Sequence, residues 1–231
     1  MDAADLTLVA AVRQALAGAG DPERAVAQQR YMKSEMPFHG ISSPQLKALL
    51  RPLLATYAPA SRAEWEATVR TLWDGATHRE ERYAALALAE HRRARAWRDP
   101  ALVPLVEHLV RTGAWWDLVD DVAVHLAGAV LAGHPDEMGP VVRAWANADD
   151  LWLRRTAVIC QLGRRDATDL DLLRHAVEAN VDDTSFWLRK AIGWALRDLA
   201  RTDPDWVRAE VDRLDGRLSG LSRREALKHL S

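Results

Sequence analysis

The sequence has a single cysteine, Cys160, among 231 residues, which excludes a disulfide framework and a thiolate metal cage. Cys160 follows the apolar run Ala157-Val158-Ile159, and this context predicts an ordinary buried thiol. The eight histidines show no His-Glu-x-x-His motif and no other paired spacing, so we expect neither a metal ion nor a cofactor. No glycine-rich phosphate loop is present, since the glycines at 18 and 20 are expected to end a helix.

Long apolar runs are also missing. A membrane span needs roughly 18 uncharged apolar residues, and the longest candidate, Val122 to Gly133, is interrupted by His125. Asp2 and Asp5 stand where a signal peptide would be basic, so we expect a cytoplasmic protein. The formal net charge of −2 excludes a chain coated in basic residues, although it permits one basic face.

Strand signals are absent, and helix signals recur along the whole chain. The segments between turn residues are amphipathic at helical period, and no stretch alternates as a strand would. Proline stands at expected helix starts at Pro22, Pro44, Pro100, Pro135 and Pro204. The sequence therefore predicts an all-α protein of about 12 to 14 helices in antiparallel pairs. We expect one continuous right-handed solenoid, with residues 1–231 forming a single HEAT-like repeat domain.

One register repeats through the second half of the chain. Asp120, Arg155, Lys190 and Arg224 follow one another at steps of 35, 35 and 34 residues, and the sequences that precede them are similar. A period near 35 is typical of stacked helix pairs, in which equivalent positions face the same wall. A carboxylate followed by three cations, with tryptophans nearby, predicts a wall that accepts an extended polyanion. The ten tryptophans favour such contacts, because indole also stacks on sugars, bases and cations.

Two pairs of residues share the same helical spacing. Trp116 and Asp120 lie four residues apart and therefore share a helix face, and Lys190 and Trp194 repeat this arrangement. Gly193 would allow either close helix packing or the approach of a ligand to the backbone. Structural alternatives remain: Asp120 could form a surface salt bridge with its neighbour in the register, Trp116 could fill the core, and the arginines could line a solvated face. The shared register favours a functional role.

Six motifs in order resemble those of the AlkD-type DNA alkylation repair glycosylases. They are Arg-Tyr-Met-Lys at 30–33, Gly-Ile-x-x-Pro at 40–44, Trp-Trp-Asp-x-Val-Asp at 115–120, Trp-Leu-x-Arg at 152–155, Lys-Ala-Ile-Gly-Trp-x-Leu-Arg at 190–197 and Leu-Ser-x-Arg-Glu-Ala-x-Lys-His at 221–229. The resemblance implies a HEAT-like superhelix whose concave wall holds duplex DNA. It also implies base excision repair of cationic N3- and N7-alkylated purines, without flipping the base into a pocket.

The resemblance further implies roles for individual residues. Trp116, Asp120 and Trp194 correspond to the catalytic residues around the deoxyribose, Arg155 to a phosphate-binding neighbour and Tyr31 to an aromatic near the site. The predicted DNA-binding set also includes Phe186, Trp187, Lys190, Arg223 and Arg224, the last two near a helix N-terminus suited to phosphate. Phe186 and Trp187 stand where the family has two phenylalanines, and Ser42 where it has a longer amide. These departures bear on substrate range.

Two other classes of function stay open at this point. One is a catalytically silent relative that binds DNA or branched nucleic acid, and the other is a HEAT scaffold that binds protein. A silent relative has no need for Trp116, Asp120, Arg155 and Trp194 together, and a scaffold would show an apolar or acidic groove. We therefore expect a cytoplasmic monomer, associated with the nucleoid when bound, whose partner is duplex DNA containing alkylated purines.

Overall fold

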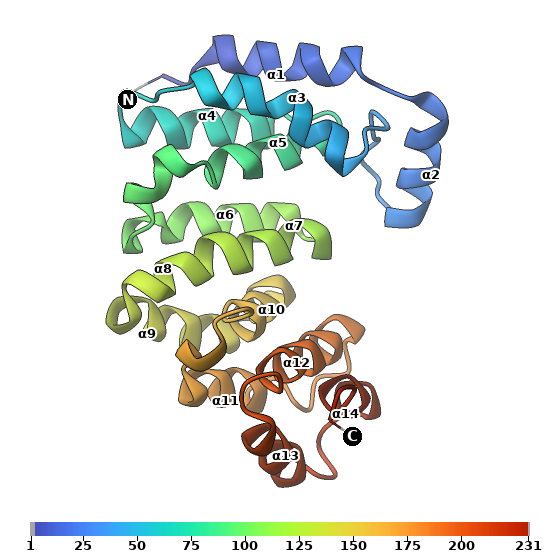
Figure 1. Ribbon diagram of the computed structural model, residues 1–231, viewed down its shortest axis with the longest axis vertical. Helices are drawn as coiled ribbons and strands as arrows, with labels where there is room; N and C mark the ends of the chain where they lie inside the picture. Colours follow the sequence, from blue (N-terminus) through green and yellow to red (C-terminus); the bar gives the residue numbers. More distant parts are fainter. Residues whose placement is uncertain (1–2, 231) are drawn as a thin grey trace. The chain divides into compact units, whose positions relative to one another are not determined.

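The chain is all-α, as predicted. The computed structural model describes residues 3–230, in which fourteen α-helices and no strand occur (Figure 1). Over these residues, no helix combines the length and the apolar character that crossing a membrane requires. The chain divides into two compact units, residues 1–97 and 98–231, which are described separately below. The single domain over 1–231 stays a prediction.

The first unit holds five α-helices and one 3-10 turn. In Figure 1, α1, α3, α4 and α5 lie side by side, and α2 lies at their edge. The helices are α1 (Leu6–Gly18), α2 (Pro22–Met32), α3 (Ser43–Thr56), α4 (Arg62–Asp74) and α5 (Arg79–Ala89), followed by η1 (Arg92–Trp97). The core of this unit includes the fully buried side chains of Leu16, Trp65, Leu72 and Trp73.

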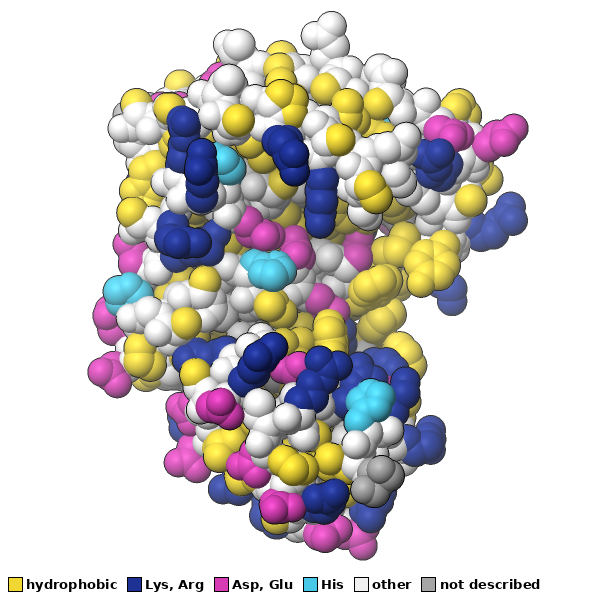
Figure 2. Space-filling view, viewed as in Figure 1, with side chains coloured by type: hydrophobic (Ala, Val, Ile, Leu, Met, Phe, Trp, Pro, Cys, Tyr) yellow, Lys and Arg dark blue, Asp and Glu magenta, His cyan; other side chains and the backbone are white. Residues whose placement is uncertain are grey.

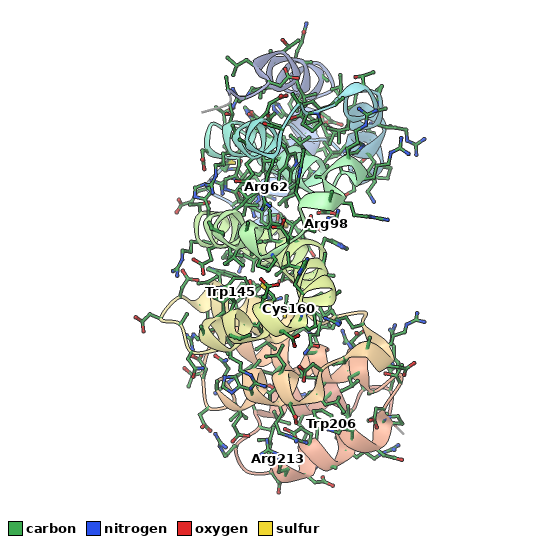
Figure 3. All side chains as sticks on the ribbon, turned by 90° about the vertical axis from the view of Figure 1, so that its left-hand side faces the viewer. Arg62, Arg98, Trp145, Cys160, Trp206 and Arg213 are labelled. Atoms are coloured by element: carbon green, nitrogen blue, oxygen red, sulfur yellow. The ribbon has the colours of Figure 1, made fainter. Side chains whose placement is uncertain are left out.

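The second unit carries most of the predicted site. Its elements are η2 (Pro100–Leu102), α6 (Val103–Gly113), α7 (Trp116–Asp121), the π-helical η3 (Val122–Ala127), α8 (Gly128–Gly133), α9 (Pro135–Ala146), α10 (Leu151–Ile159), η4 (Arg165–Ala167), α11 (Leu170–Glu178), α12 (Phe186–Leu199), α13 (Pro204–Arg213) and α14 (Gly220–Ala226). Helix α10 contacts α7, α9 and α12, and α12 in turn contacts α14. Cys160, labelled in Figure 3, is buried, and this burial raises its pKa to about 12. The predicted buried thiol is confirmed.

The helix starts predicted at the prolines are confirmed, except that Pro44 lies one residue later in its helix than expected. Pro22, Pro135 and Pro204 are the first residues of α2, α9 and α13, and Pro100 begins a 3-10 turn. Pro44 is instead the second residue of α3, because Ser42 rather than Ser43 is the N-cap. Proline suits these places because the first turn of a helix needs no intrahelical N–H donor there.

The 35-residue period corresponds to contacts between successive repeats of the second unit. Pairs separated by 35 residues form the ion pairs Asp120–Arg155, Glu178–Arg213, Asp182–Arg217 and Lys190–Glu225. A fifth pair is a hydrogen bond from the backbone N–H of Gly163 to Asp198. Equivalent positions of neighbouring repeats are therefore adjacent in space, which is the physical origin of the repeated register.

Gly193 allows α12 and α14 to approach closely. A Cβ at this position would lie 2.5 Å from the Cβ of Glu225 and 2.9 Å from the backbone oxygen of Ser222. Both distances are far shorter than van der Waals contact, so the helices would have to move apart. Of the two roles open to this glycine, helix packing is the one that the structure shows.

Replacing Gly193 with alanine is expected to lower the free energy of unfolding by about 2 kcal/mol, since overpacking outweighs the gain in helix propensity. Gly139 in α9 is the matched control, because a Cβ there would meet no atom within 4 Å. Gly139→Ala should be neutral or stabilising. Urea denaturation of both variants measures the difference, and equal midpoints would disprove the packing role.

Candidate active site

Helices α7 and α10 bring Asp120 and Arg155 together. Helix α7 begins at Trp116, and Asp120 lies one turn further along it. Helix α10 is started by Asp150, whose carboxylate accepts the backbone N–H groups of Trp152 and Leu153 and so satisfies two donors of the first turn. Arg155 follows on the first full turn of α10 and reaches back to the preceding repeat.

The ion pair between Asp120 and Arg155 is bidentate and largely buried. Nε of Arg155 donates to Oδ1 of Asp120 and Nη2 to Oδ2, both at 2.7 Å. Nη1 of Arg155 donates to the backbone oxygen of Trp187 at 2.6 Å. The side chains of Arg155 and Asp120 are 4% and 14% exposed, respectively. The expected alternative of a salt bridge between Asp120 and Arg155 is therefore confirmed as a pairing. The pair is largely buried instead of lying on the surface, and the guanidinium group of Arg155 is directed at Asp120 and at the backbone oxygen of Trp187.

Arg155 offsets only part of the effect that burial has on the pKa of Asp120. Burial raises its pKa, the hydrogen bonds and charge of Arg155 lower it, and the neighbouring Asp117 and Asp121 raise it again, with a net increase over the ordinary 3.8. The other described carboxyls with a resolved pKa shift are all lowered, namely Glu178, Asp182, Asp183, Glu210 and Glu225. Additional positive charge beside Asp120 would therefore stabilise its ionised form.

Four aromatic side chains support this pair. Ring centroids of Trp115, Trp152 and Trp187 lie 5.2 to 6.1 Å apart, and Phe186 packs edge-on against Trp187 at 5.2 Å. Such tilted and edge-to-face pairs are favourable arrangements of aromatic rings. The cluster holds the start of α12, and therefore the Trp187 carbonyl that receives Arg155. The sequence prediction did not include Trp115 and Trp152 in the site, although Trp152 and Trp187 are one repeat apart.

Trp116 and Trp194 are the remaining residues of the predicted catalytic set. Trp116 lies four residues before Asp120 on α7 and thus on the same helix face. Trp194 lies two helical turns beyond Trp187 on α12. Both side chains are partly exposed, which leaves indole surface available for a ligand.

Of the two cations further along the register, Lys190 is engaged by a carboxylate. Glu225 accepts a hydrogen bond from Nζ of Lys190 at 2.6 Å and one from Nη1 of Arg197 at 2.5 Å. Arg223 pairs with Asp215 at 3.1 Å, and Arg224 is exposed. On the face drawn in Figure 2, lysine and arginine side chains are likewise interspersed with acidic ones. The predicted ladder of cations is therefore neutralised at Arg155 and Lys190.

Arg223 and Arg224 are the fourth and fifth residues of the seven-residue helix α14, so they lie within about one turn of both of its ends. The N-cap of α14 is Ser219, whose hydroxyl accepts the backbone N–H of Ser222, and the helix ends at Ala226. Both arginines consequently lie in the last turn of this short helix, where the dipole does not favour an anion. The guanidinium group of the exposed Arg224, rather than a backbone amide, is what this helix could offer to phosphate.

Tyr31 and Ser42 belong to the first unit. Tyr31 lies near the end of α2 and is 78% exposed, so its ring is available to a partner. Ser42 caps α3, and both its hydroxyl and its backbone N–H bond to Gln45. The nearness of Tyr31 to the catalytic residues stays a prediction.

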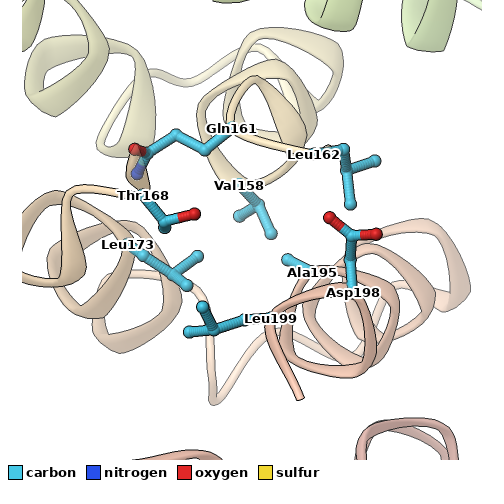
Figure 4. A pocket seen from close by; sticks show the side chains of 8 residues that line it. All are labelled: Val158, Gln161, Leu162, Thr168, Leu173, Ala195, Asp198 and Leu199. Carbon is cyan, nitrogen blue, oxygen red and sulfur yellow. The ribbon is translucent and has the colours of Figure 1, made fainter. Parts of the chain in front are cut away.

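A small cavity in the second unit is too small for a base. It is enclosed by α10, α11 and α12 and has a volume of about 10 Å³, which accommodates at most one water molecule (Figure 4). Its lining residues are Val158, Gln161, Leu162, Thr168, Leu173, Ala195, Asp198 and Leu199, and none belongs to the predicted site.

Comparison with known proteins identifies the family. Residues 12–230 match the model of a family described as DNA alkylation repair enzyme. A solved structure of a predicted DNA alkylation repair enzyme from Enterococcus faecalis is 31% identical to this chain and superposes with a TM-score of 0.81, over 92% of this chain and 97% of that one. No curated protein matches the chain. The match over nearly the whole length shows that the chain belongs to the DNA alkylation repair enzyme family.

Proposed function

We propose that this protein is a DNA glycosylase that hydrolyses the N-glycosidic bond of positively charged N3- and N7-alkylated purines in duplex DNA. Membership of the family gives it a role in the repair of alkylated DNA. The observation that carries the finer proposal is the largely buried carboxylate of Asp120. Arg155 donates two hydrogen bonds to it, and the pKa of Asp120 is nevertheless raised. Such a group stabilises a cation that forms next to it.

The proposed reaction needs no acid to release the base. In an N3- or N7-alkylated purine the leaving ring is already cationic, so breaking the bond to C1′ returns the electron pair to the ring and neutralises it. Positive charge then develops on the sugar, and water attacks C1′ and loses a proton. A carboxylate about 4 Å from that charge contributes roughly 4 kcal/mol at an effective dielectric constant near 20, or about a thousandfold in rate. Asp120 would provide this charge and orient the water.

Arg155 acts in this proposal as a positioning residue. Its three hydrogen bonds fix the carboxylate of Asp120 relative to the start of α12. Its side chain is only 4% exposed, so this role accounts for the residue better than direct contact with a phosphate. Small displacements of a catalytic group have large kinetic effects, and a rigid buried bond network limits them.

Trp116 and Trp194 would contact the sugar and the cationic base. An indole face within about 6 Å of a cation contributes about 0.5 to 2 kcal/mol. A cationic base that leaves unaided requires no enclosed pocket of its own, which is compatible with excision while the base remains stacked in the duplex. We further propose that DNA is contacted by Tyr31, Phe186, Trp187, Lys190, Arg223 and Arg224.

The direct test is incubation with duplex DNA containing N7-methylguanine, followed by chromatography of the released bases. The proposal predicts free 7-methylguanine and an abasic site. Tight binding without release would identify a silent DNA-binding relative, and absence of both would favour a protein-binding scaffold.

The excision rate should decrease at acidic pH. Asp120 must be ionised to stabilise the sugar cation, and its raised pKa places the acid limb of the profile above 3.8, the ordinary value. Single-turnover rates across this range, with circular dichroism to confirm folding, measure the effect. Any residual excision by an Asp120→Asn variant should lack this limb. A wild-type rate that stays constant through the acidic range would contradict the assignment.

DNA affinity should decrease steeply with salt, because each neutralised phosphate contributes about −0.9 to the slope of log K against log salt. Arg224 is exposed in the proposed interface, so Arg224→Ala should make that slope shallower by about one. Arg208, an exposed arginine of α13, provides the control, and its replacement should leave the slope unchanged. Equal slopes for all three proteins would remove Arg224 from the interface.

A further inference from the structure

Two elements of the first unit carry cations and no acid. Helix α3 contains Lys47 and Arg51, and the 3-10 turn η1 contains Arg92, Arg93 and Arg95. Neither sequence contains an aspartate or a glutamate, although the chain as a whole has a formal net charge of −2. In the upper part of Figure 2, lysine and arginine side chains gather over and beside α3. These five residues are called the α3–η1 cations below.

Lys47 and Arg51 lie on one face of α3. They are four residues apart and both are exposed, and the next position of the same row is Ala55. Like charges at this spacing destabilise a helix, and α3 has no acid that would offset their repulsion. A partner that carries negative charge would relieve this repulsion.

The packing of η1 directs its arginines outward. In a 3-10 helix, side chains three residues apart lie one above the other. Ala94 is buried, and Trp97 packs against Trp65 of α4 with ring centroids 5.4 Å apart, so this row of η1 faces the core. Arg92 and Arg95, also three residues apart, form a neighbouring row, and both are exposed.

Arg93 joins the two elements. Its Nη1 donates to the backbone oxygen of Tyr57 at 2.6 Å, and its Nη2 to that of Ala55 at 3.2 Å. Because Ala55 follows Lys47 and Arg51 in their row, Arg93 lies at the end of that row. The row from 47 to 55 is about 12 Å long at about 1.5 Å per residue. One strand of DNA presents a phosphate about every 3.4 Å along the axis, so about three or four phosphates match this length.

The other four α3–η1 cations are not neutralised within the protein. Over residues 3–230, Lys47, Arg51, Arg92 and Arg95 form no hydrogen bond or ion pair with a carboxylate. By contrast, Lys190 of the second unit is held by a glutamate at 2.6 Å. The charge of the α3–η1 cations is therefore available to a partner.

The pKa of His91 is consistent with an excess of positive charge at η1. Burial lowers this pKa, the charges of Arg92 and Arg93 lower it further, and no carboxylate among the described residues opposes them. An anion bound at η1 would raise the pKa of His91.

The chemistry of this surface favours nucleic acid over a membrane. A helix that lies on a membrane buries large apolar side chains in it. Among the described residues, the large apolar side chains that are exposed are Leu6, Val26, Tyr31 and Phe186, and none of them belongs to α3 or η1. Four of the five cations are arginines, whose planar guanidinium groups bind phosphate through two parallel hydrogen bonds.

We propose that the α3–η1 cations contact the phosphate backbone of duplex DNA, whether or not that DNA carries a damaged base. Contacts to phosphate carry no sequence information, so this surface would hold undamaged DNA and allow the protein to slide along it. The inference rests on the proposed binding of duplex DNA. It adds a surface of the first unit to that binding, and none of its five residues belongs to the proposed site.

The test is the affinity of the full chain for an undamaged duplex, measured by fluorescence anisotropy over a range of salt concentrations. One variant combines Lys47→Gln with Arg51→Gln, and a second combines Arg92→Gln with Arg95→Gln. Each should make the slope of log K against log salt shallower by about two, and weaken binding at least about tenfold at about 0.1 M salt. The pKa of His91, followed by NMR, should rise when the wild type binds DNA.

The matched control combines Arg143→Gln with Arg201→Gln, which removes two exposed arginines of the second unit and should leave the slope unchanged. The four replaced α3–η1 side chains are exposed, so both variants should fold, and circular dichroism verifies this. Single-turnover excision of N7-methylguanine with saturating protein tests the proposed function separately, and its rate should be the same in the wild type and both variants.

Three results would overturn this inference, even where excision is rapid. The first is a wild-type slope in either α3–η1 variant, and the second is an equal change of slope in the control. The third is unchanged DNA affinity in the variants together with weakened binding to vesicles of phosphatidylserine and phosphatidylcholine, which would assign the surface to a membrane. Absence of excision by the wild type, with the predicted slopes, would contradict the proposed function and leave this DNA contact supported.

Discussion

Replacing Asp120 with asparagine is expected to reduce single-turnover excision of N7-methylguanine by about a thousandfold. The substitution preserves the shape of the side chain and removes the negative charge that would stabilise the sugar cation. It also leaves the buried Arg155 without its counterion, so the free energy of unfolding should decrease by about 3 kcal/mol. DNA affinity should be maintained or increase slightly, because a carboxylate repels phosphates in the ground state.

Glu210→Gln separates the catalytic effect from the loss of stability. Glu210 in α13 is also a buried, ion-paired acid, 1% exposed, and accepts hydrogen bonds from Arg174 and from Arg213, which is labelled in Figure 3. Its replacement should destabilise the protein to a similar extent and leave excision unchanged. Thermal melts and excision rates of both variants make the comparison. Equal excision by folded Asp120→Asn and wild type would remove Asp120 from the catalytic residues.

Replacing Arg155 with lysine is expected to reduce excision by about a hundredfold, even though the positive charge is kept. An ammonium group cannot reproduce the planar fork that bonds both oxygens of Asp120, and misplacement of a catalytic group by about 1 Å costs a factor of this size. DNA affinity should be unchanged, because Arg155 is buried. The acid limb of the pH–rate profile should move further upward, since the carboxylate loses two charge-assisted hydrogen bonds.

Arg154→Lys is the matched control, because Arg154 is the adjacent residue and pairs with Asp183 instead. It should excise at nearly the wild-type rate. Loss of DNA affinity in Arg155→Lys, with an unshifted acid limb, would instead indicate that Arg155 contacts phosphate.

The helical repeat could be predicted because local and periodic sequence patterns specify it. Prolines and capping residues mark the helix starts, and the 35-residue register of Asp120, Arg155 and Lys190 corresponds to contacts between successive repeats. The same register predicted that Asp120 either pairs with Arg155 or has a functional role, and the pairing was one of these two interpretations. These inferences required only spacing along the chain and the geometry of a helix.

The burial of the site residues and the identity of their hydrogen-bond partners could not be predicted in the same way. The depth of Arg155 depends on the Trp187 carbonyl and on three tryptophans from α10, α12 and the residue before α7, which converge only in the folded unit. Ser222 with Glu225 has the spacing of a capping box, yet Ser219 caps α14 and Glu225 binds Lys190 and Arg197. Glu225 is thus engaged by side chains of α12, and the hydroxyl of Ser222 donates to the backbone oxygen of Arg189 in the same helix.

Catalysis by Asp120 is tested most directly by chromatography of the bases released from duplex DNA containing N7-methylguanine, with wild type and Asp120→Asn compared under single-turnover conditions. We expect rapid release of 7-methylguanine by the wild type and release about a thousandfold slower by the folded variant. Absence of release by the wild type, or equal release by both proteins, would contradict catalysis by Asp120.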